Sequence, residues 1–406
     1  MKLLQISIEV NSNSVGRIAE QIGQTALDAG WESYITYARN HQPSKSTTIK
    51  IGNKLDVMVH GLRTRIFDDH CLASARATRK LIKQIDEIKP DIILLHHIHG
   101  YYLNMVVLFE YLAKIDTPLV WIQHDCWNFT GHCAYFDYIG CDRWKTGCYS
   151  CPLKTSYPAS YIFDRSRKNY IDKNKLFNSV KNLTIVSVSN WLGNLVSQSF
   201  LSKNSLKVIH NGVDINAFKL ISNRSIIKEK YGLNDKFVLL GVATAWSKRK
   251  GIFDYYKLNE KLNKDFQIIL VGLSQKQIKE LPKGIIGIER TESIEELVEY
   301  YNMSDIVLNL SYEETFGLTT VEGFACGTPG IVYNATASPE LVTPETGIII
   351  EKGDIDGIVE AINQIKLKGK EFYSENCRNR VVTCFNKDDR FKEYIVLFTS
   401  LIEDKK

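Results

Sequence analysis

Two glutamates that lie eight positions apart, Glu314 and Glu322, stand where the sequence pattern changes from strand to helix. The run before them, residues 305–311, is apolar and rich in β-branched side chains, which predicts a parallel strand buried on both faces. From Leu318 the pattern is helical, and it stops at Gly327. The end of such a strand and the start of the next helix meet in one crevice, where backbone N–H groups favour an anion. The sequence therefore predicts a diphosphate site.

Phosphate itself would repel a glutamate, so we expect both carboxylates to accept hydrogen bonds from hydroxyl groups beside it. A sugar on one side of the diphosphate and a ribose on the other would supply such hydroxyls. The alternatives are an ordinary polar loop residue for Glu314 and a solvated helix face for Glu322.

This segment resembles the E-x7-E motif of the family-4 retaining glycosyltransferases, including the Phe-Gly that follows the first glutamate. The resemblance covers nearly the full chain and is densest over residues 237–322. It implies an α/β protein of the GT-B fold, with two Rossmann-like doubly wound domains facing across a cleft. It also implies that a nucleotide-sugar donor binds at Glu314, Phe316, Gly317, Leu318, Thr319 and Glu322.

Lys250 is the first candidate for the cation that stabilises a leaving diphosphate, a task that fixed charges can perform without a metal. It follows a predicted strand at residues 237–242 and resembles the family's Lys-Gly that reaches the donor phosphates. The family usually has an arginine five or six positions earlier, where this chain has Thr244 and Ala245. Arg249 is the candidate to replace that charge. The alternative is a basic surface loop.

In the first half, Gly16 and Arg17 follow a predicted strand at residues 3–10 and open a helix. A glycine at this place lets backbone approach a phosphate, so we expect Gly16 near the donor diphosphate with Arg17 beside it. A solvated arginine is the alternative for Arg17.

Three histidines follow another predicted strand, in the run Leu-His-His-Ile-His-Gly at residues 95–100. The resemblance implies that a histidine here lines the site for the donor sugar and the acceptor. His96 and His99 are the candidates, and we assign them to catalysis together with Lys250 and Glu314. For His97, a packed or surface position is as good an interpretation as a place in the site.

The next predicted strand ends at His124 and Asp125, which we place on the acceptor side. Asp125 either orients His124 or binds acceptor hydroxyls, and the alternative is a helix cap or turn residue. No general base is assigned, because the resemblance implies that the leaving phosphate accepts the proton on the same face of the sugar. Positioning and charge stabilisation then supply most of the catalysis.

Five of the nine cysteines lie between residues 126 and 151. Four of them have the spacing Cys133-x7-Cys141-x6-Cys148-x2-Cys151, whose last pair is typical of a zinc knuckle. A structural zinc is the leading interpretation, with a redox or disulfide role and unligated cysteines as alternatives. No catalytic metal is expected.

The chain has 406 residues, 44% of them hydrophobic and 24% charged, which suits two globular domains. We expect an N-terminal acceptor-side domain at residues 1–205, with a cysteine-rich insertion at 126–152. The nucleotide-sugar domain is expected at 206–387. By resemblance, a last helix at 388–406 packs back on the first domain.

The formal net charge is +5, and the basic excess falls in the first half. A basic cluster there could attract anionic headgroups or an acidic acceptor, although a solvated face is the favoured interpretation. Its members are Arg63, Arg65, Arg76, Arg79, Lys80 and Lys83. No secretion signal is visible, so we expect a cytoplasmic protein, peripheral at the inner face of the membrane. No nucleic-acid-binding signature is present.

The sequence therefore predicts a retaining glycosyltransferase that uses a UDP- or GDP-sugar and a saccharide or lipid-linked saccharide acceptor. Residues 124–152 resemble a subset of the family that assembles bacterial surface polysaccharides (capsule, O-antigen or exopolysaccharide). Two alternatives remain at this stage: a nucleotide-sugar epimerase, and a non-catalytic subunit that binds a sugar nucleotide or a glycan.

Overall fold

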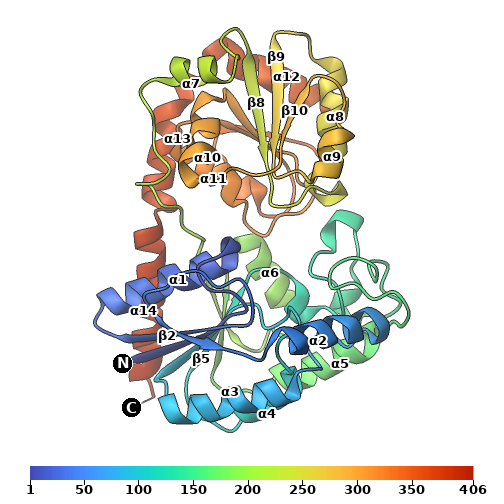
Figure 1. The fold of residues 1–406 in the computed structure, drawn as a ribbon, viewed down its shortest axis with the longest axis vertical. Coiled ribbons are helices and arrows are strands. Elements are labelled where there is room, and N and C mark those ends of the chain that lie inside the picture. Colours follow the sequence, from blue (N-terminus) through green and yellow to red (C-terminus); the bar gives the residue numbers. More distant parts are fainter. Residues whose placement is uncertain (406) are drawn as a thin grey trace. The chain divides into compact units, whose positions relative to one another are not determined.

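A computed structural model describes residues Met1–Lys405 (Figure 1). The chain divides into two compact units, each with its own sheet. The first unit comprises Met1–His210 and the segment from Arg390 onward, and the second comprises Asn211–Asp389. All strand pairs in both sheets are parallel, so the predicted α/β class with two Rossmann-like, doubly wound units is confirmed.

The first unit has a seven-stranded sheet in the order β3-β2-β1-β4-β5-β6-β7. Its strands are β1 (Lys2–Ile6), β2 (Glu32–Tyr37), β3 (Thr47–Lys50), β4 (Ile92–Leu95), β5 (Leu119–Gln123), β6 (Leu183–Ser187) and β7 (Ser205–Val208). The central strands β4, β5 and β6 are buried along their whole length, as expected for strands covered on both faces.

Figure 1 shows helices on both faces of this sheet, with α1 on one side and α3 and α4 on the other. The helices of the unit are α1 (Asn13–Asp28), α2 (Lys54–Phe67), α3 (Ala75–Ile88), α4 (Met105–Leu112), α5 (Ser166–Phe177), α6 (Asn190–Gln198) and most of α14 (Lys387–Glu403). Three short 3₁₀ turns, Trp127–Phe129, Asp137–Ile139 and Arg143–Lys145, lie in the cysteine-rich insertion. Helix α14 buries Phe398 near Trp31, with ring centroids 6.4 Å apart.

The second unit has a six-stranded sheet in the order β10-β9-β8-β11-β12-β13. Its strands are β8 (Phe237–Val242), β9 (Phe266–Val271), β10 (Ile285–Ile288), β11 (Ile306–Asn309), β12 (Gly330–Tyr333) and β13 (Gly347–Ile350). Its helices are α7 (Arg224–Lys230), α8 (Ile252–Lys261), α9 (Gln275–Lys279), α10 (Ile294–Met303), α11 (Leu318–Ala325), α12 (Ile355–Lys368) and α13 (Lys370–Cys384), with 3₁₀ turns at Lys248–Lys250 and Ser338–Glu340.

Each sheet reverses its winding at one place, between β1 and β4 in the first unit and between β8 and β11 in the second. In open α/β sheets, ligands bind outside the carboxyl ends of the strands at this point. The segments that follow these four strands are therefore where a site is expected in each unit.

Along the chain, the boundary between the units follows His210, five residues after the predicted boundary at residue 205. Residues 206–208, which were expected in the second domain, belong to β7, which pairs with β6 and forms the edge of the first sheet. Its short alternating pattern fits either sheet, and only the pairing decides between them. Within the described residues, no helix combines the length and the apolar character that crossing a membrane requires.

Candidate active site

An ion pair between Lys250 and Glu314 lies at the point where the second sheet reverses its winding. Lys250 follows β8, and Glu314 follows the neighbouring strand β11. Their side chains are 18% and 12% exposed, respectively. Two residues that are 64 positions apart in the sequence are thus brought into direct contact where a ligand is expected.

Neighbouring groups hold the Glu314 carboxylate and its backbone in place. The hydroxyl of Ser311 donates to Glu314 Oε1 over 3.0 Å, and the Glu314 N–H donates to Thr336 Oγ1 over 2.8 Å. Arg249 donates to the carbonyl oxygen of Glu313 over 2.7 Å. The structure therefore places Arg249 beside the pair, and its role as a second cation for the donor phosphates stays a prediction.

Two glycines allow the backbone to take this form. Gly251 has a φ of +71°, and a Cβ there would lie 2.0 Å from the carbonyl oxygen of Leu310. Only glycine lets the Lys250 loop approach the end of β11 so closely. Gly317 precedes α11 with a φ of +104°, a conformation that L side chains rarely adopt.

The two charges of the pair act on each other's ionisation. Burial raises the pKa of Glu314, but the positive charges of Lys250 and Arg249 outweigh it, and the net pKa is lowered. Burial lowers the pKa of Lys250, against the attraction of Glu314. Because the carboxyl group is held in its ionised form, the pair is a fixed anion and cation rather than a proton donor and acceptor.

Glu322 lies on α11, and a buried tyrosine orients it. The hydroxyl of Tyr301, which comes from α10, donates to Glu322 Oε2 over 2.7 Å. Phe316 is buried, with its ring 5.7 Å from that of Phe385. Leu318 and Thr319 form the first turn of α11, whose amino end has no side-chain cap. The predicted donor residues thus lie along one continuous segment after β11.

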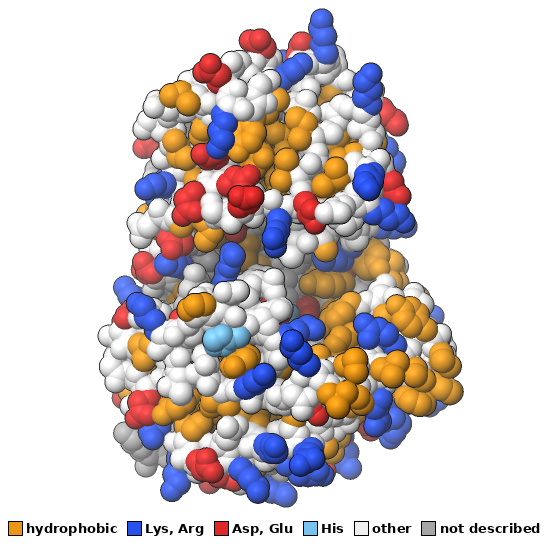
Figure 2. All heavy atoms as spheres, in the orientation of Figure 1, with side chains coloured by type: hydrophobic (Ala, Val, Ile, Leu, Met, Phe, Trp, Pro, Cys, Tyr) orange, Lys and Arg blue, Asp and Glu red, His pale blue; other side chains and the backbone are white. Residues whose placement is uncertain are grey.

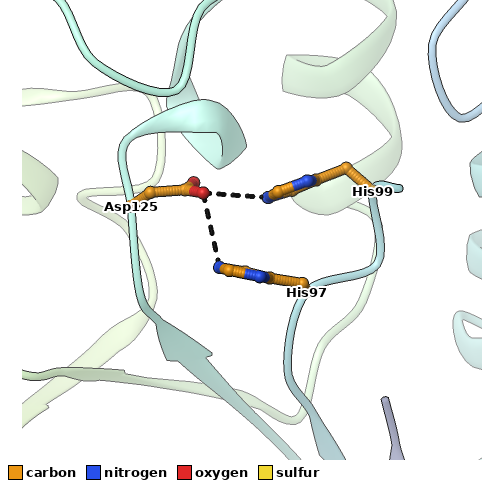
Figure 3. A group of neighbouring side chains, drawn as sticks. All are labelled: His97, His99 and Asp125. Atoms are coloured by element: carbon orange, nitrogen blue, oxygen red, sulfur yellow. Dashed lines mark hydrogen bonds and ion pairs between the residues drawn. The ribbon is translucent and has the colours of Figure 1, made fainter. Parts of the chain in front are cut away.

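In the first unit, His97, His99 and Asp125 converge after the ends of β4 and β5 (Figure 3). His99 Nε2 lies 3.0 Å from Asp125 Oδ2, and His97 Nε2 lies 3.3 Å from the same oxygen. The other oxygen of Asp125 accepts from the Trp127 N–H over 2.9 Å. His99 Nδ1 lies 3.0 Å from the hydroxyl of Tyr157.

The protonation of this trio follows from its burial. Burial raises the pKa of Asp125, but His99 and His97 outweigh it and hold the pKa below its usual range. Burial lowers the pKa of His97 to about 4. Near neutral pH an ionised carboxylate therefore faces a neutral His97, whose Nε2 is buried and makes no hydrogen bond.

Two nitrogens and one carboxylate oxygen form a donor set that can hold a divalent transition metal. Within residues 1–405, this is the one group of His, Cys, Asp or Glu side chains whose ligand atoms all lie within 4.8 Å of one another. Both nitrogens of His99 already have partners in the protein, so a metal would have to displace the bond to Asp125. The contacts present favour a carboxylate that holds His99 by a hydrogen bond and faces His97 at 3.3 Å.

His96 and His124 lie deeper than the trio. His96 Nε2 is 3.0 Å from Gln5 Oε1, its Nδ1 is 3.2 Å from His124 Nε2, and the two rings stack with centroids 5.5 Å apart. Burial lowers the pKa of His96 to about 3. Both nitrogens of His96 are thus engaged inside the unit, which is a supporting position rather than one facing a substrate. Asp125, for which orienting His124 was one of the expected roles, lies against His99 and His97.

Gly16 and Arg17 lie in the first turns of α1. Gly16 is buried where a Cβ would come within 3.1 Å of Glu9 Cβ, and its carbonyl oxygen accepts from the Asn11 N–H over 3.0 Å. The described role of Gly16 is therefore close packing of the loop after β1. Arg17 is exposed.

The four cysteines of the insertion surround a small cavity of about 10 Å³. Cys133 and Cys151 are hydrogen bonded, which raises the pKa of Cys133 and lowers that of Cys151 to about 7. In the described part of the chain, the four sulfurs do not gather within the 4.8 Å that the trio achieves. His132 also lines the cavity, with its Nδ1 bonded to Asp68 and its buried Nε2 without a partner.

The sequence prediction did not select His97, Tyr157 or Tyr301. A signal for His97 existed, since it lies in the same three-histidine run as His96 and His99. Which of the three histidines meets Asp125 depends on the path of the loop after β4. Tyr157 and Tyr301 lie 58 and 21 positions from their partners, and no local pattern marks them.

The two Rossmann-like units, each with a parallel sheet, make up the GT-B fold of glycosyltransferases. Residues 15–217 match the family described as Glycosyltransferase Family 4, and residues 223–380 match the family described as Glycosyl transferases group 1. The chain belongs to glycosyltransferase family 4 and is a glycosyltransferase.

Three known proteins show what this chain is similar to in sequence or in structure. WcaC of Escherichia coli K12, named as a colanic acid biosynthesis glycosyl transferase, is 22% identical over 89% of this chain and 90% of its own. An E. coli UDP-Gal:alpha-D-GlcNAc-diphosphoundecaprenol alpha-1,3-galactosyltransferase is 26% identical over 52% of this chain and 58% of its own. The structure of Anabaena Alr3699/HepE in complex with UDP-glucose has a TM-score of 0.67 at 17% identity, covering 98% of this chain and all of that one.

Proposed function

We propose that this glycosyltransferase moves a sugar, with retention of configuration, from a UDP- or GDP-sugar to a saccharide or lipid-linked saccharide. The step belongs to cell-surface polysaccharide biosynthesis, at the cytoplasmic side of the membrane. Support comes from relatives named for colanic acid biosynthesis and for transfer to a diphosphoundecaprenol-linked sugar. The observation that carries the proposal is the Lys250 and Glu314 pair at the ends of β8 and β11.

In this proposal, Lys250 and Arg249 stabilise the negative charge that develops on the leaving diphosphate. Fixed cations in a partly dehydrated site act more strongly than the same charges in water and need no reorganisation during the reaction. Glu314 keeps Lys250 in place and, with its second oxygen, accepts hydrogen bonds from sugar hydroxyls. Glu322, oriented by Tyr301, is proposed to accept from the ribose.

The trio in the first unit is proposed to orient the acceptor and the donor sugar. Asp125 fixes His99, and His97 presents the most exposed ring of the three side chains, with 21% of its side chain accessible. The proposal needs no catalytic metal. Proton transfer from the acceptor hydroxyl goes to the leaving phosphate, and the histidines hold the hydroxyl in position.

A structural zinc is proposed for the cysteine insertion. Cys133, Cys141, Cys148 and Cys151 face one cavity, and thiolates are the ligands that zinc prefers. The thiols would draw together around the ion, since a Zn–S bond is about 2.3 Å long. The buried Nε2 of His132 lines the same cavity without a hydrogen-bond partner, which is consistent with a binding site there. Zinc here would hold a loop-rich insertion together, because all four positions are filled by the protein.

The donor site is tested by ligand-induced thermal stabilisation with a panel of UDP-, GDP- and ADP-sugars. At about 100 times the dissociation constant, a donor should add about 2.7 kcal/mol of stability. We expect one sugar nucleotide to raise the melting temperature of the wild type but not of Lys250→Ala or Glu322→Ala. Lys248→Ala, an exposed lysine in the same loop, is the matched control and should respond like the wild type. No response to any sugar nucleotide would contradict the proposal.

A further inference from the structure

Helix α2 has the reverse of the usual amphipathic arrangement. Its buried residues are His60, Gly61 and Thr64, which are polar or small. Four of its exposed residues are apolar and between 46% and 65% exposed: Leu55, Met58, Val59 and Leu62. The other exposed residues include Lys54, Arg63 and Arg65. The four apolar residues recur at intervals of three and four positions, which is one face of a helix. An exposed apolar face on such a helix marks a site of interaction with another molecule or a membrane.

The apolar surface continues from α2 onto a neighbouring loop. The Tyr161 N–H donates to the Arg65 carbonyl over 2.8 Å, and the Phe163 N–H donates to the Ile66 carbonyl over 3.0 Å. Phe163 also stacks on Phe67, with ring centroids 5.8 Å apart. We call the whole set the α2 surface: Leu55, Met58, Val59, Leu62, Phe67, Tyr161, Ile162, Phe163 and Ile171, each at least 46% exposed.

Figure 2 shows hydrophobic side chains gathered on this side of the first unit, with Lys and Arg side chains beside them. At one edge, Phe67, Phe163 and Ile171 line an open hollow of about 660 Å³ with five charged side chains, Asp164, Arg165, Arg167, Lys168 and Asp172. Three cations and two carboxylates therefore border the apolar area at this edge, with a net positive charge.

The charges of the two segments that build the α2 surface are mainly positive. Residues 54–67 and 161–172 contain six basic side chains and three acidic ones. The basic ones are Lys54, Arg63, Arg65, Arg165, Arg167 and Lys168, and the acidic ones are Asp56, Asp164 and Asp172. Such a border complements an anionic partner and repels a cationic one.

The border also decides between a bilayer and a second copy of the chain. In a two-fold dimer each patch meets itself, so the basic borders would face one another. An anionic bilayer offers negative headgroups to the cations and an apolar interior to the side chains between them. Arginine and lysine can reach the headgroups while their stems lie along apolar surface.

We propose that the α2 surface docks this protein on an anionic lipid bilayer, with its apolar side chains at the boundary between headgroups and acyl chains. This deepens the peripheral membrane contact of the proposed function by naming the surface. All of its residues lie in the first unit, so docking does not require the Lys250 and Glu314 pair. The two can therefore fail independently.

The test is co-sedimentation of the full chain with vesicles of phosphatidylcholine alone or mixed with phosphatidylglycerol. We expect binding to the mixed vesicles, weak binding to the neutral ones, and loss of binding as salt is raised. The double variant Leu62→Ser/Ile162→Ser should bind at least tenfold more weakly, because two apolar anchors are removed. Val396→Ser, at a 70% exposed position on α14, is the matched control and should bind like the wild type.

A charge series separates the α2 surface from the basic residues of α3. Lys54→Gln/Arg65→Gln/Arg167→Gln should weaken binding to the mixed vesicles several-fold, whereas Arg76→Gln/Lys80→Gln/Lys83→Gln should have a smaller effect. If the α3 variant loses binding and the α2 variants keep it, the proposal is overturned. Met58→Gln is a second apolar variant in case the double variant does not fold.

Three other results would also overturn the proposal. The wild type could fail to bind either vesicle, or the Val396→Ser control could lose binding as much as the double variant. Sedimentation velocity could also show a dimer that the double variant abolishes, without vesicle binding, and the α2 surface would then be a contact between copies. Donor-induced stabilisation of the double variant should match the wild type, whereas Lys250→Ala should lose the donor response and keep vesicle binding.

Discussion

At the scale of residues, the contact between Lys250 and Glu314 both keeps the lysine charged and holds it in a fixed position. A cation that must meet a diphosphate needs a partner that keeps it charged and fixed in a partly buried position. Glu314 supplies both, and Ser311 satisfies the same carboxylate oxygen from the side. In the proposed donor site, Glu314 can lie beside a phosphate because Lys250 and Arg249 already balance its charge.

A double-mutant cycle measures this pairing. Lys250→Met should lower the free energy of unfolding by about 2–4 kcal/mol, because it leaves the Glu314 carboxylate buried without its cation. The double variant with Glu314→Gln should lose less than the sum of the two single changes, by about 1–3 kcal/mol. Urea denaturation measures both values, and Lys248→Met is the control that should change little. Strictly additive losses would contradict the ion pair.

The buried histidines of the first unit make stability depend on pH. Burial lowers the pKa of His60 to about 4, of His96 to about 3 and of His97 to about 4. In the unfolded chain these groups titrate near pH 6.5, so below that pH the unfolded state binds more protons. Stability should therefore fall as pH is lowered from about 7 to 5. His132 has the opposite effect, because Asp68 raises its pKa against the effect of burial and the folded state therefore gains stability from this group at lower pH.

Denaturant unfolding at several pH values between about 5 and 7 checks the sign and the slope. A His60→Asn variant should show a slope that is smaller by about one proton. Stability that stays constant over this range, or that rises as the pH falls, would contradict the buried, neutral state of these rings.

At the scale of elements, the sequence was most informative where periodicity and punctuation agree. The segment from β11 through α11 was predicted closely, because a short apolar run, a glycine with positive φ and a helical repeat follow one another. The strand β3 was not predicted, because residues 47–50 are largely polar and only Ile49 is buried. As an edge strand, β3 carries too few core residues to be distinguished from a loop.

The side-chain partners within the site were less accessible to sequence reasoning. Glu314 and Lys250 could be selected because each lies in a motif next to a strand end. Their direct contact depends on the adjacency of β8 and β11, which only the sheet order fixes. The reversed α2 was also missed, because apolar residues on one face of a helix usually mark its buried face. Only the observed burial shows that this face of α2 is exposed.

The cysteine insertion yields a prediction at the same scale. The purified protein should contain about one zinc per chain, and Cys148→Ser/Cys151→Ser should remove the metal and lower the melting temperature by about 5 °C or more. Elemental analysis and thermal unfolding measure the two effects. Cys384→Ser, outside the insertion, should retain both the metal and the stability. A wild-type protein that holds no zinc and does not respond to chelators would contradict this site.

At the scale of the whole molecule, the chain combines three separable parts. The second unit carries the charged pair, the first carries the histidines with Asp125, and the α2 surface of the first unit faces outward with apolar and basic side chains. A transferase that acts on a lipid-linked acceptor needs all three: a donor site, an acceptor site and a means of staying at the bilayer. The residues of each part are distinct, so each can be altered alone.

Transfer of a sugar with retention at the Lys250 and Glu314 pair can be tested directly on the anomeric carbon of the donor. Proton NMR can follow the anomeric signal of the stabilising donor, incubated with the full-length protein and a panel of saccharides, with water as a further acceptor. We expect the first-formed product to keep the anomeric configuration of the donor, and Lys250→Ala to lower the rate at least about 100-fold. A product of inverted configuration, or a folded Lys250→Ala variant with the wild-type rate, would contradict it.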